Sequence, residues 1–125
     1  MIILDPPFCE EVFEKVKTIE DIKKTKPNST LIFDYCDSSI EVYNFCKIND
    51  IPYGVKINTI KELIFISNLN AKYAFADNIE NAKIFQKIAN EYLLDTKIIL
   101  FIDSLDDIEQ IALLGIDGVK LKENK

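Results

Sequence analysis

The sequence lacks histidine and tryptophan, and it has few glycines (3), prolines (4) and cysteines (3) among its 125 residues. Without histidine, Ser-His-Asp and Cys-His catalysis are excluded, as are most catalytic zinc sites. The three glycines are isolated, so they form neither a GxGxxG motif nor a P-loop that would cradle a phosphate. We therefore predict no metal ion and no cofactor.

Long apolar runs and paired cysteines are also missing. No stretch approaches the roughly 20 apolar residues that cross a bilayer. The apolar residues 1–4 run directly into an aspartate and two prolines, which does not fit a signal peptide. We therefore expect a cytoplasmic protein that does not bind membranes. The cysteines are odd in number and form no CxxC pair, so we expect buried or half-buried free thiols: Cys9, Cys36 and Cys46.

The overall composition is that of a globular protein. Hydrophobic residues make up 48% of the chain, and the net charge is -6. A chain of this length suits one domain, which we expect to span residues 1–125. An acidic chain lacks the basic face that a nucleic-acid groove requires, so we expect no nucleic-acid partner.

Six short apolar runs recur at intervals of about 20 to 29 residues and alternate with segments of helical periodicity. Continuous apolar runs are typical of parallel strands that are buried on both faces. Strand–helix alternation predicts right-handed βαβ units. The predicted strands are Ile2–Leu4, Leu31–Phe33, Tyr53–Val55, Tyr73–Ala76, Ile98–Ile102 and Gly118–Leu121.

This pattern predicts an α/β fold of repeated βα units with about six mostly parallel strands. Two architectures fit it: an open three-layer sheet of the flavodoxin or Rossmann type, and an incomplete TIM-type barrel. Six strands cannot close as a standard eight-stranded barrel and would leave unpaired edges. The open sheet is therefore favoured.

The segment between the first two runs allows two interpretations. Pro6 and Pro7 are compatible with a helix that continues to Lys17, whereas part of residues 12–16 fits an extended strand. Thr18 begins a further helix in either case.

An internal repeat places Ile57–Leu63 over Ile102–Ile108 at an offset of 45 residues. Each copy ends a strand and opens a helix with a Thr/Ser-x-x-Glu/Asp capping box. A duplicated βαβα block and convergence on common capping chemistry both explain it.

Polar side chains follow the predicted strands. Because ligands of parallel α/β folds sit beyond the carboxyl ends of the strands, these residues predict a rim that holds a small anionic or polar metabolite. Two alternatives stay open: the aspartates cap helices, and the lysines extend from strand ends into solvent. A lysine inside such a site is also a Schiff-base candidate. The candidate ligand-binding residues are Asp34, Lys56, Asp77, Asp103 and Lys120.

The segment Ser104–Leu121 resembles the helix and strand that lead to the Schiff-base lysine of the 2-keto-3-deoxy-6-phosphogluconate aldolase family of TIM barrels. Leu31–Lys122 resembles strands two to six of such a barrel. The resemblance implies that Lys120 is the catalytic lysine of an aldolase-type lyase that acts on a keto acid. Ile32 occupies the position of the family's catalytic glutamate.

The segment Tyr73–Asp77 resembles the strand of response-regulator receiver domains that ends in the phosphoacceptor aspartate. Lys122 then matches the receiver lysine, and Ile102 lies near the position of the expected hydroxyl residue. The resemblance implies magnesium-dependent phosphorylation of Asp77.

In each resemblance an isoleucine stands where the family's reaction requires a polar side chain. This residue is Ile32 in the aldolase resemblance and Ile102 in the receiver resemblance. The leading hypothesis is therefore a non-catalytic binding or regulatory module rather than an enzyme. The alternative is the aldolase-type lyase acting through Lys120. We expect a homodimer or another protein partner to cover the unpaired edges of the sheet.

Overall fold

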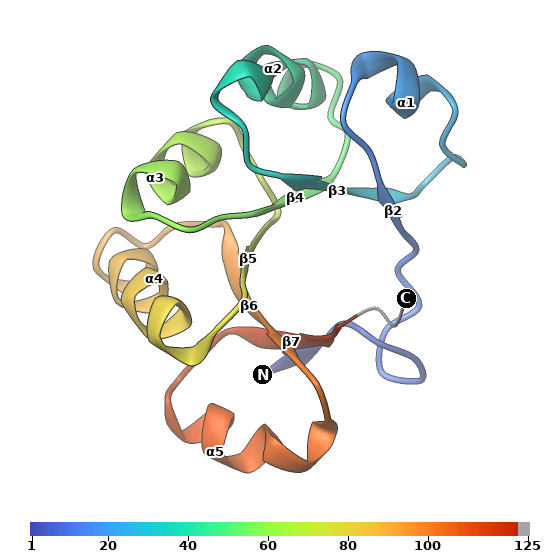
Figure 1. The fold of residues 1–125 in the computed structure, drawn as a ribbon. Helices are drawn as coiled ribbons and strands as arrows, with labels where there is room; N and C mark the ends of the chain where they lie inside the picture. The colour runs from blue at the N-terminus through green and yellow to red at the C-terminus, as the bar shows by residue number, and fades with distance from the viewer. Residues whose placement is uncertain (123–125) are drawn as a thin grey trace.

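The computed structural model describes residues 1–122, in which seven strands form one curled sheet. All neighbouring strands are parallel, in the order β1-β7-β6-β5-β4-β3-β2. The sheet bends round most of a ring, as Figure 1 shows. The strands are β1 (Ile2–Ile3), β2 (Phe13–Lys15), β3 (Thr30–Asp34), β4 (Tyr53–Lys56), β5 (Tyr73–Ala76), β6 (Lys97–Ile102) and β7 (Gly118–Leu121).

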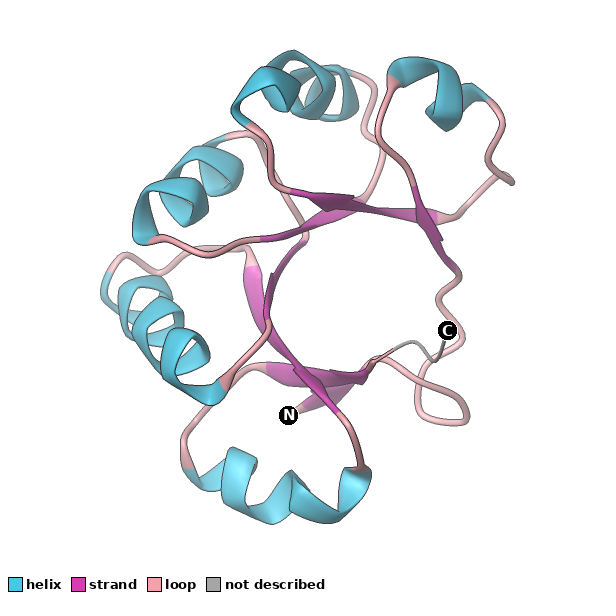
Figure 2. Cartoon of the chain, in the orientation of Figure 1, coloured by secondary structure: helices cyan, strands magenta, loops and turns pink. Residues whose placement is uncertain are grey.

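Five α-helices in the described part of the chain connect successive strands from β2 to β7, and all lie outside the ring (Figure 2). Residues 37–39 and 105–107 form 3-10 turns that lead into the second and fifth helices. The helices are α1 (Ile19–Lys23), α2 (Ile40–Ile48), α3 (Ile60–Asn68), α4 (Ile79–Glu91) and α5 (Ile108–Leu113).

The structure has the second of the two expected architectures, the incomplete TIM-type barrel, and the preference for an open three-layer sheet was wrong. From β2 to β7 each strand lies beside the preceding one in the chain. Right-handed crossovers in one direction place every helix on the same face. An open doubly wound sheet requires the strand order to reverse, so that helices cover both faces.

Side chains alternate between the two faces of the curled sheet and form two apolar clusters. One cluster packs between sheet and helices and includes Leu31, Val55 and Ile98. The other fills the interior of the ring, where Phe75 and Phe101 stack with ring centroids 4.9 Å apart. Burial on both faces explains why the strands are continuously apolar in sequence.

The six expected strands are confirmed, and β2 is a seventh. The helix expected from Pro6 to Lys17 is wrong, and the extended alternative for part of residues 12–16 is correct. Phe13 faces the interior with its ring 6.1 Å from that of Tyr73. Val16 is buried toward the helices, and its N–H donates to Ile32. This alternation has the period of a strand.

The predicted helix starts are present, although the two copies of the repeat differ. Thr18 forms a complete capping box with Asp21 at α1. Thr59 accepts from Glu62 N at the start of α3. In the second copy Ser104 caps a 3-10 turn rather than an α-helix. None of the helices within residues 1–122 has the length and apolar content that crossing a bilayer requires.

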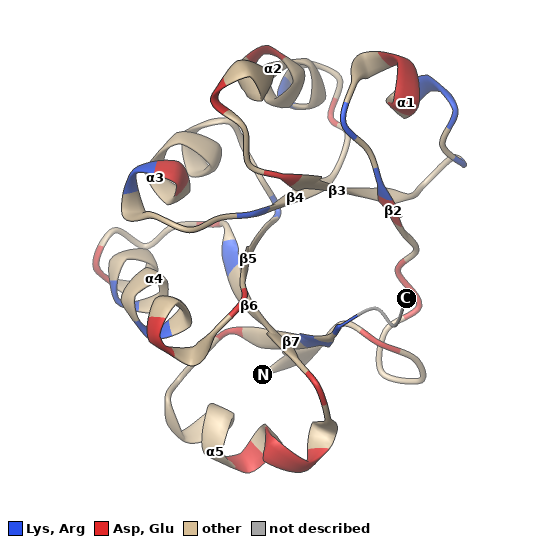
Figure 3. Cartoon of the chain, in the orientation of Figure 1, with Lys and Arg blue, Asp and Glu red and all other residues tan. Residues whose placement is uncertain are grey.

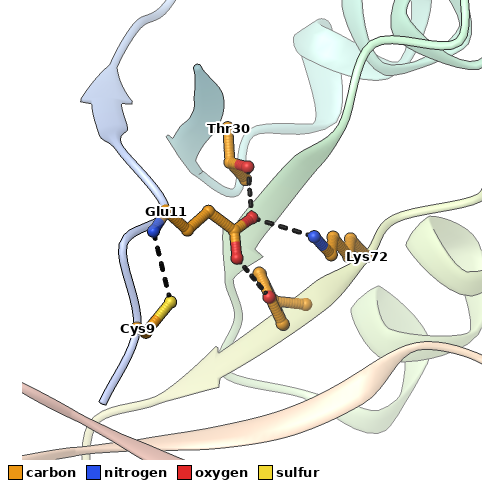
Figure 4. Close-up of polar contacts among 5 residues, drawn as sticks. Cys9, Glu11, Thr30 and Lys72 are labelled. Carbon is orange, nitrogen blue, oxygen red and sulfur yellow. Dashed lines mark hydrogen bonds and ion pairs between the residues drawn. The ribbon is translucent and has the colours of Figure 1, made fainter. Parts of the chain in front are cut away.

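Glu11 lies near the amino ends of β3 and β5, where its carboxylate accepts hydrogen bonds from several side chains (Figure 4). It lies in the connection between the edge strands β1 and β2, and its carboxylate accepts from Thr30 Oγ1. Tyr73 OH donates to it at 2.7 Å, and Lys72 Nζ at 3.0 Å. Burial alone would raise the pKa of Glu11, but these hydrogen bonds and the Lys72 charge together hold it below its ordinary value. The contacts tie this connection to β3 and β5.

Candidate functional site

A cavity of about 250 Å³, which we call the rim cavity, lies at the carboxyl ends of the strands. Because side chains alternate along each strand, inward-facing charged residues near the ends of β2, β3 and β4 meet there. Its floor is apolar, and its other lining residues are charged. The lining residues are Lys15, Ile32, Asp34, Lys56, Asp77, Phe101 and Lys122.

Ion pairs connect the charged residues of the rim cavity. Lys56 Nζ lies 2.9 Å from Asp77 Oδ2, and Lys15 Nζ lies 3.6 Å from Asp34 Oδ2. The hydrogen bond to Asp77 raises the pKa of Lys56, with a smaller contribution from the charge of Asp34. Lys56 is therefore held as an ammonium ion, which is not a nucleophile.

Three of the five predicted site residues, Asp34, Lys56 and Asp77, line the rim cavity together. Asp103 does not line it: its side chain is 83% exposed and lies 3.5 Å from Lys122 Nζ. Their positions after parallel strands predicted that all five residues lie at one edge of the sheet. These positions do not determine which of the side chains point into the same cavity.

Lys120 also lies outside the lining of the rim cavity. Its ammonium is 3.4 Å from Asp5 Oδ1 and 4.9 Å from the centre of the Phe13 ring. The Lys120 side chain is only 11% exposed, and that of Asp5 only 15%. Asp5 Oδ2 also accepts from Leu121 N at 2.8 Å. This pair therefore joins the β1 end of the sheet to β7.

The aspartates of the rim are not helix caps. The N-cap of α4 is Asn78 rather than Asp77, and the turn after β6 is capped by Ser104 rather than Asp103. The turn after β3 has Cys36 at its N-cap position, two residues beyond Asp34. The capping interpretation of these three aspartates was wrong, and their carboxylates face solvent or a lysine instead.

Sequence reasoning missed Lys15 because the strand that carries it was only one of two interpretations of this segment. The signal was the alternation of Phe13, Glu14 and Lys15, which is short enough to be read as part of a helix. Phe101 and Ile32 were predicted as strand residues, but their place in the cavity floor follows from the curvature of the sheet.

The three cysteines are free thiols in different environments. Cys46 is buried, and burial raises its pKa to about 11. Cys9 is half-buried, as expected, but Cys36 is exposed. Hydrogen bonding to Ser38, whose Oγ lies 2.9 Å from the sulfur, lowers the pKa of Cys36.

Larger hollows lie at the opposite end of the sheet. One of them, of about 670 Å³, is lined by loop residues such as Asp50, Asn70 and Asp95 that follow the helix ends. In residues 1–122 no group of three or more acidic or thiol side chains is arranged to hold a metal ion. In the rim cavity, charged groups from β2, β3 and β4 converge with charged residues that follow β5 and β7.

Comparison with known proteins found no family model that matches this chain and no curated protein that is significantly similar to it.

Proposed function

We propose that this protein is a non-catalytic binding module that holds a small polar or anionic metabolite in the rim cavity. The observation that carries the proposal is the convergence of three lysines and two aspartates on one hollow at the carboxyl ends of parallel strands. Ligands of parallel α/β proteins occupy this position. These charged side chains lie at or near the ends of different strands of one sheet. Sites built on strands hold their side chains more precisely than sites on loops, which favours specific binding.

The ion pairs of Lys56 and Lys120 support binding rather than covalent catalysis. A Schiff base requires an amine that is free to attack a carbonyl. Lys56 is held charged by Asp77 at 2.9 Å. Lys120 is covered and paired with Asp5. Ile32, on the floor of the cavity, offers no acid or base.

Heteronuclear NMR of the labelled protein tests this proposal. The probes are inorganic phosphate, glycerol 3-phosphate, pyruvate, glycerol and L-valine at millimolar concentrations. We expect at least one probe to shift the amide signals at the ends of β3, β4 and β5. Lys56→Gln should weaken that binding, whereas Lys87→Gln on the exposed side of α4 should not. If no probe shifts these signals, or if Lys56→Gln binds as the wild type does, the proposal is wrong.

The aldolase-type lyase is the alternative, and the incomplete barrel supports that resemblance more than the receiver resemblance. In this alternative Lys120 Nζ condenses with the keto group of the substrate and releases water. Borohydride reduction in the presence of pyruvate would trap the imine as a stable adduct on Lys120. An adduct that is absent from Lys120→Ala would favour the enzyme over the binding module.

Two other expectations remain predictions. The receiver resemblance predicts magnesium-dependent phosphorylation of Asp77 by a phosphoramidate donor, which intact-mass measurement detects. Association with a second copy is tested by light scattering after size-exclusion chromatography.

A further inference from the structure

Charges of opposite sign alternate along the rim from β2 to β5. Lys15 ends β2 and Asp34 ends β3, while Lys56 ends β4 and Asp77 follows β5. Asp34 and Lys56 are register partners on adjacent strands. Figure 3 shows both signs of charge around the ring of strands. A ligand in the rim cavity therefore meets cationic and anionic groups side by side.

The charges of the rim cavity compensate one another. Of its three lysines, Lys15 pairs with Asp34 and Lys56 pairs with Asp77 inside the cavity, and Lys122 pairs with Asp103 outside it. A dianion such as phosphate would leave the aspartates facing a like charge. It would also find no guanidinium fork, because the chain contains no arginine.

The two ion pairs inside the cavity are exposed to solvent, so a ligand can replace the partner of each charged side chain. The side chains of Lys15, Asp34, Lys56 and Asp77 are between 36% and 61% exposed. Solvent-exposed pairs of this kind are weak, so a ligand displaces them at little cost. The covered pair of Lys120 and Asp5 is not available in this way.

The size and floor of the cavity limit the ligand further. A cavity of about 250 Å³ is smaller than most pockets for drug-sized ligands, so it suits a small ligand. The floor is formed by Ile32 and Phe101, which favour contact with an aliphatic group.

We infer that the rim cavity binds a small aliphatic zwitterion, with its anionic group on the lysines and its cationic group on the aspartates. The inference rests on the proposed function of the cavity. A zwitterion brings one anionic group to the lysines and one cationic group to the aspartates, so both signs of charge in the cavity gain a partner. A free amino acid with a short aliphatic side chain has this chemistry and this size.

Three probes that share one carbon skeleton test the inference by NMR titration. L-valine has both charges, 2-hydroxy-3-methylbutanoate has only the anionic one, and valinol has only the cationic one. We expect L-valine to bind about tenfold or more tightly than either analogue, because each analogue loses one charge-assisted contact.

Variants assign the two ends of the ligand. Asp34→Asn should weaken binding of L-valine and valinol but not of the hydroxy acid. Lys15→Gln should weaken binding of L-valine and the hydroxy acid but not of valinol. Lys87→Gln serves as the control, and thermal melts confirm that each variant is folded.

The outcomes separate this inference from the proposed function. If the hydroxy acid, inorganic phosphate or glycerol shifts the rim signals at concentrations where L-valine does not, or binds as tightly as L-valine, the zwitterion inference is overturned and the binding module stands. If none of the probes shifts those signals, both are overturned.

Discussion

Lys56 Nζ on β4 lies 2.9 Å from Asp77 Oδ2, which follows the neighbouring strand β5. The contact raises the pKa of Lys56 above its ordinary value of 10.5. We predict that Asp77→Asn returns the pKa of Lys56 toward that value. An alkaline NMR titration of the lysine side chains measures the change. In the control Asp103→Asn, the titration of Lys56 should stay as in the wild type.

The sign of the stability effect follows from the same shift. A lysine whose pKa is raised by folding stabilises the native state below its unfolded pKa, and loses that contribution as the pH rises through the folded value. Both side chains are more than a third exposed, so the pair contributes less than about 1 kcal/mol at neutral pH. Identical titration of Lys56 in the wild type and in Asp77→Asn would contradict the prediction.

Glu11 should matter more for stability, because its carboxylate is largely covered. Glu11→Gln removes the charge that Tyr73, Lys72 and Thr30 donate to, and we expect it to lower the free energy of unfolding by about 1–3 kcal/mol at neutral pH. Urea unfolding measures this. The control Glu10→Gln, at the exposed neighbouring position, should change little.

The effect of Glu11→Gln should depend on pH. Folding lowers the pKa of Glu11, so its stabilisation is present above the unfolded value of about 4.5 and is lost as the pH falls through the folded value. The difference between wild type and variant should therefore shrink in acid. A difference that is constant with pH would show that the carboxylate charge is not responsible.

Gly54 should tolerate no side chain. A Cβ there would lie 2.6 Å from Phe75 Cε2 and 3.0 Å from Tyr73 Cβ, inside the aromatic interior of the ring. We expect Gly54→Ala to cost about 1–3 kcal/mol of unfolding free energy through overpacking. Gly115 is the control, because its φ is +74° and it has open space around it. Gly115→Asn should stay within about 0.5 kcal/mol of the wild type, since asparagine adopts this conformation readily. Equal losses in both variants would contradict the prediction.

Leu93 occupies a backbone conformation that leucine disfavours. Its φ is +51°, and its side chain is 86% exposed. Asn70 has the equivalent left-handed position after α3, with φ of 62°. We predict that Leu93→Asn raises the free energy of unfolding by about 0.5–1 kcal/mol, because asparagine is less strained there.

Leu113 provides the matched control for Leu93. It is 88% exposed but lies in helix α5, where asparagine is a poorer helix former than leucine. Leu113→Asn should therefore bring no gain. A gain of the same size in both variants, measured by urea unfolding, would show that reduced surface hydrophobicity rather than backbone strain is the cause.

The strands could be predicted because burial on both faces leaves continuous apolar runs, as in Ile98–Ile102. The three-residue strand β2 could be given only as one of two alternatives, because its alternation is too short to be distinguished from one helical turn. The sequence pattern also could not decide between an open sheet and the curved sheet of an incomplete barrel. The curvature depends on strand order and on how rings such as Phe75 and Phe101 fill the interior.

The candidate site could likewise be predicted only in part. Asp34, Lys56 and Asp77 follow from the rule that the carboxyl ends of parallel strands share one edge. The covering of Lys120 could not be predicted, because Asp5 lies 115 positions away and meets it only when β1 pairs with β7. Local sequence contains no signal for a contact of that kind.

The pairing of β1 with β7 has a consequence for synthesis. Ile2 leaves the ribosome long before Gly118, its register partner. The nascent chain can assemble β2 through β6 while β1 still lacks its neighbouring strand. Until β7 emerges, Leu4 cannot donate its N–H to Val119, and the apolar strand β1 is available to chaperones or to other chains.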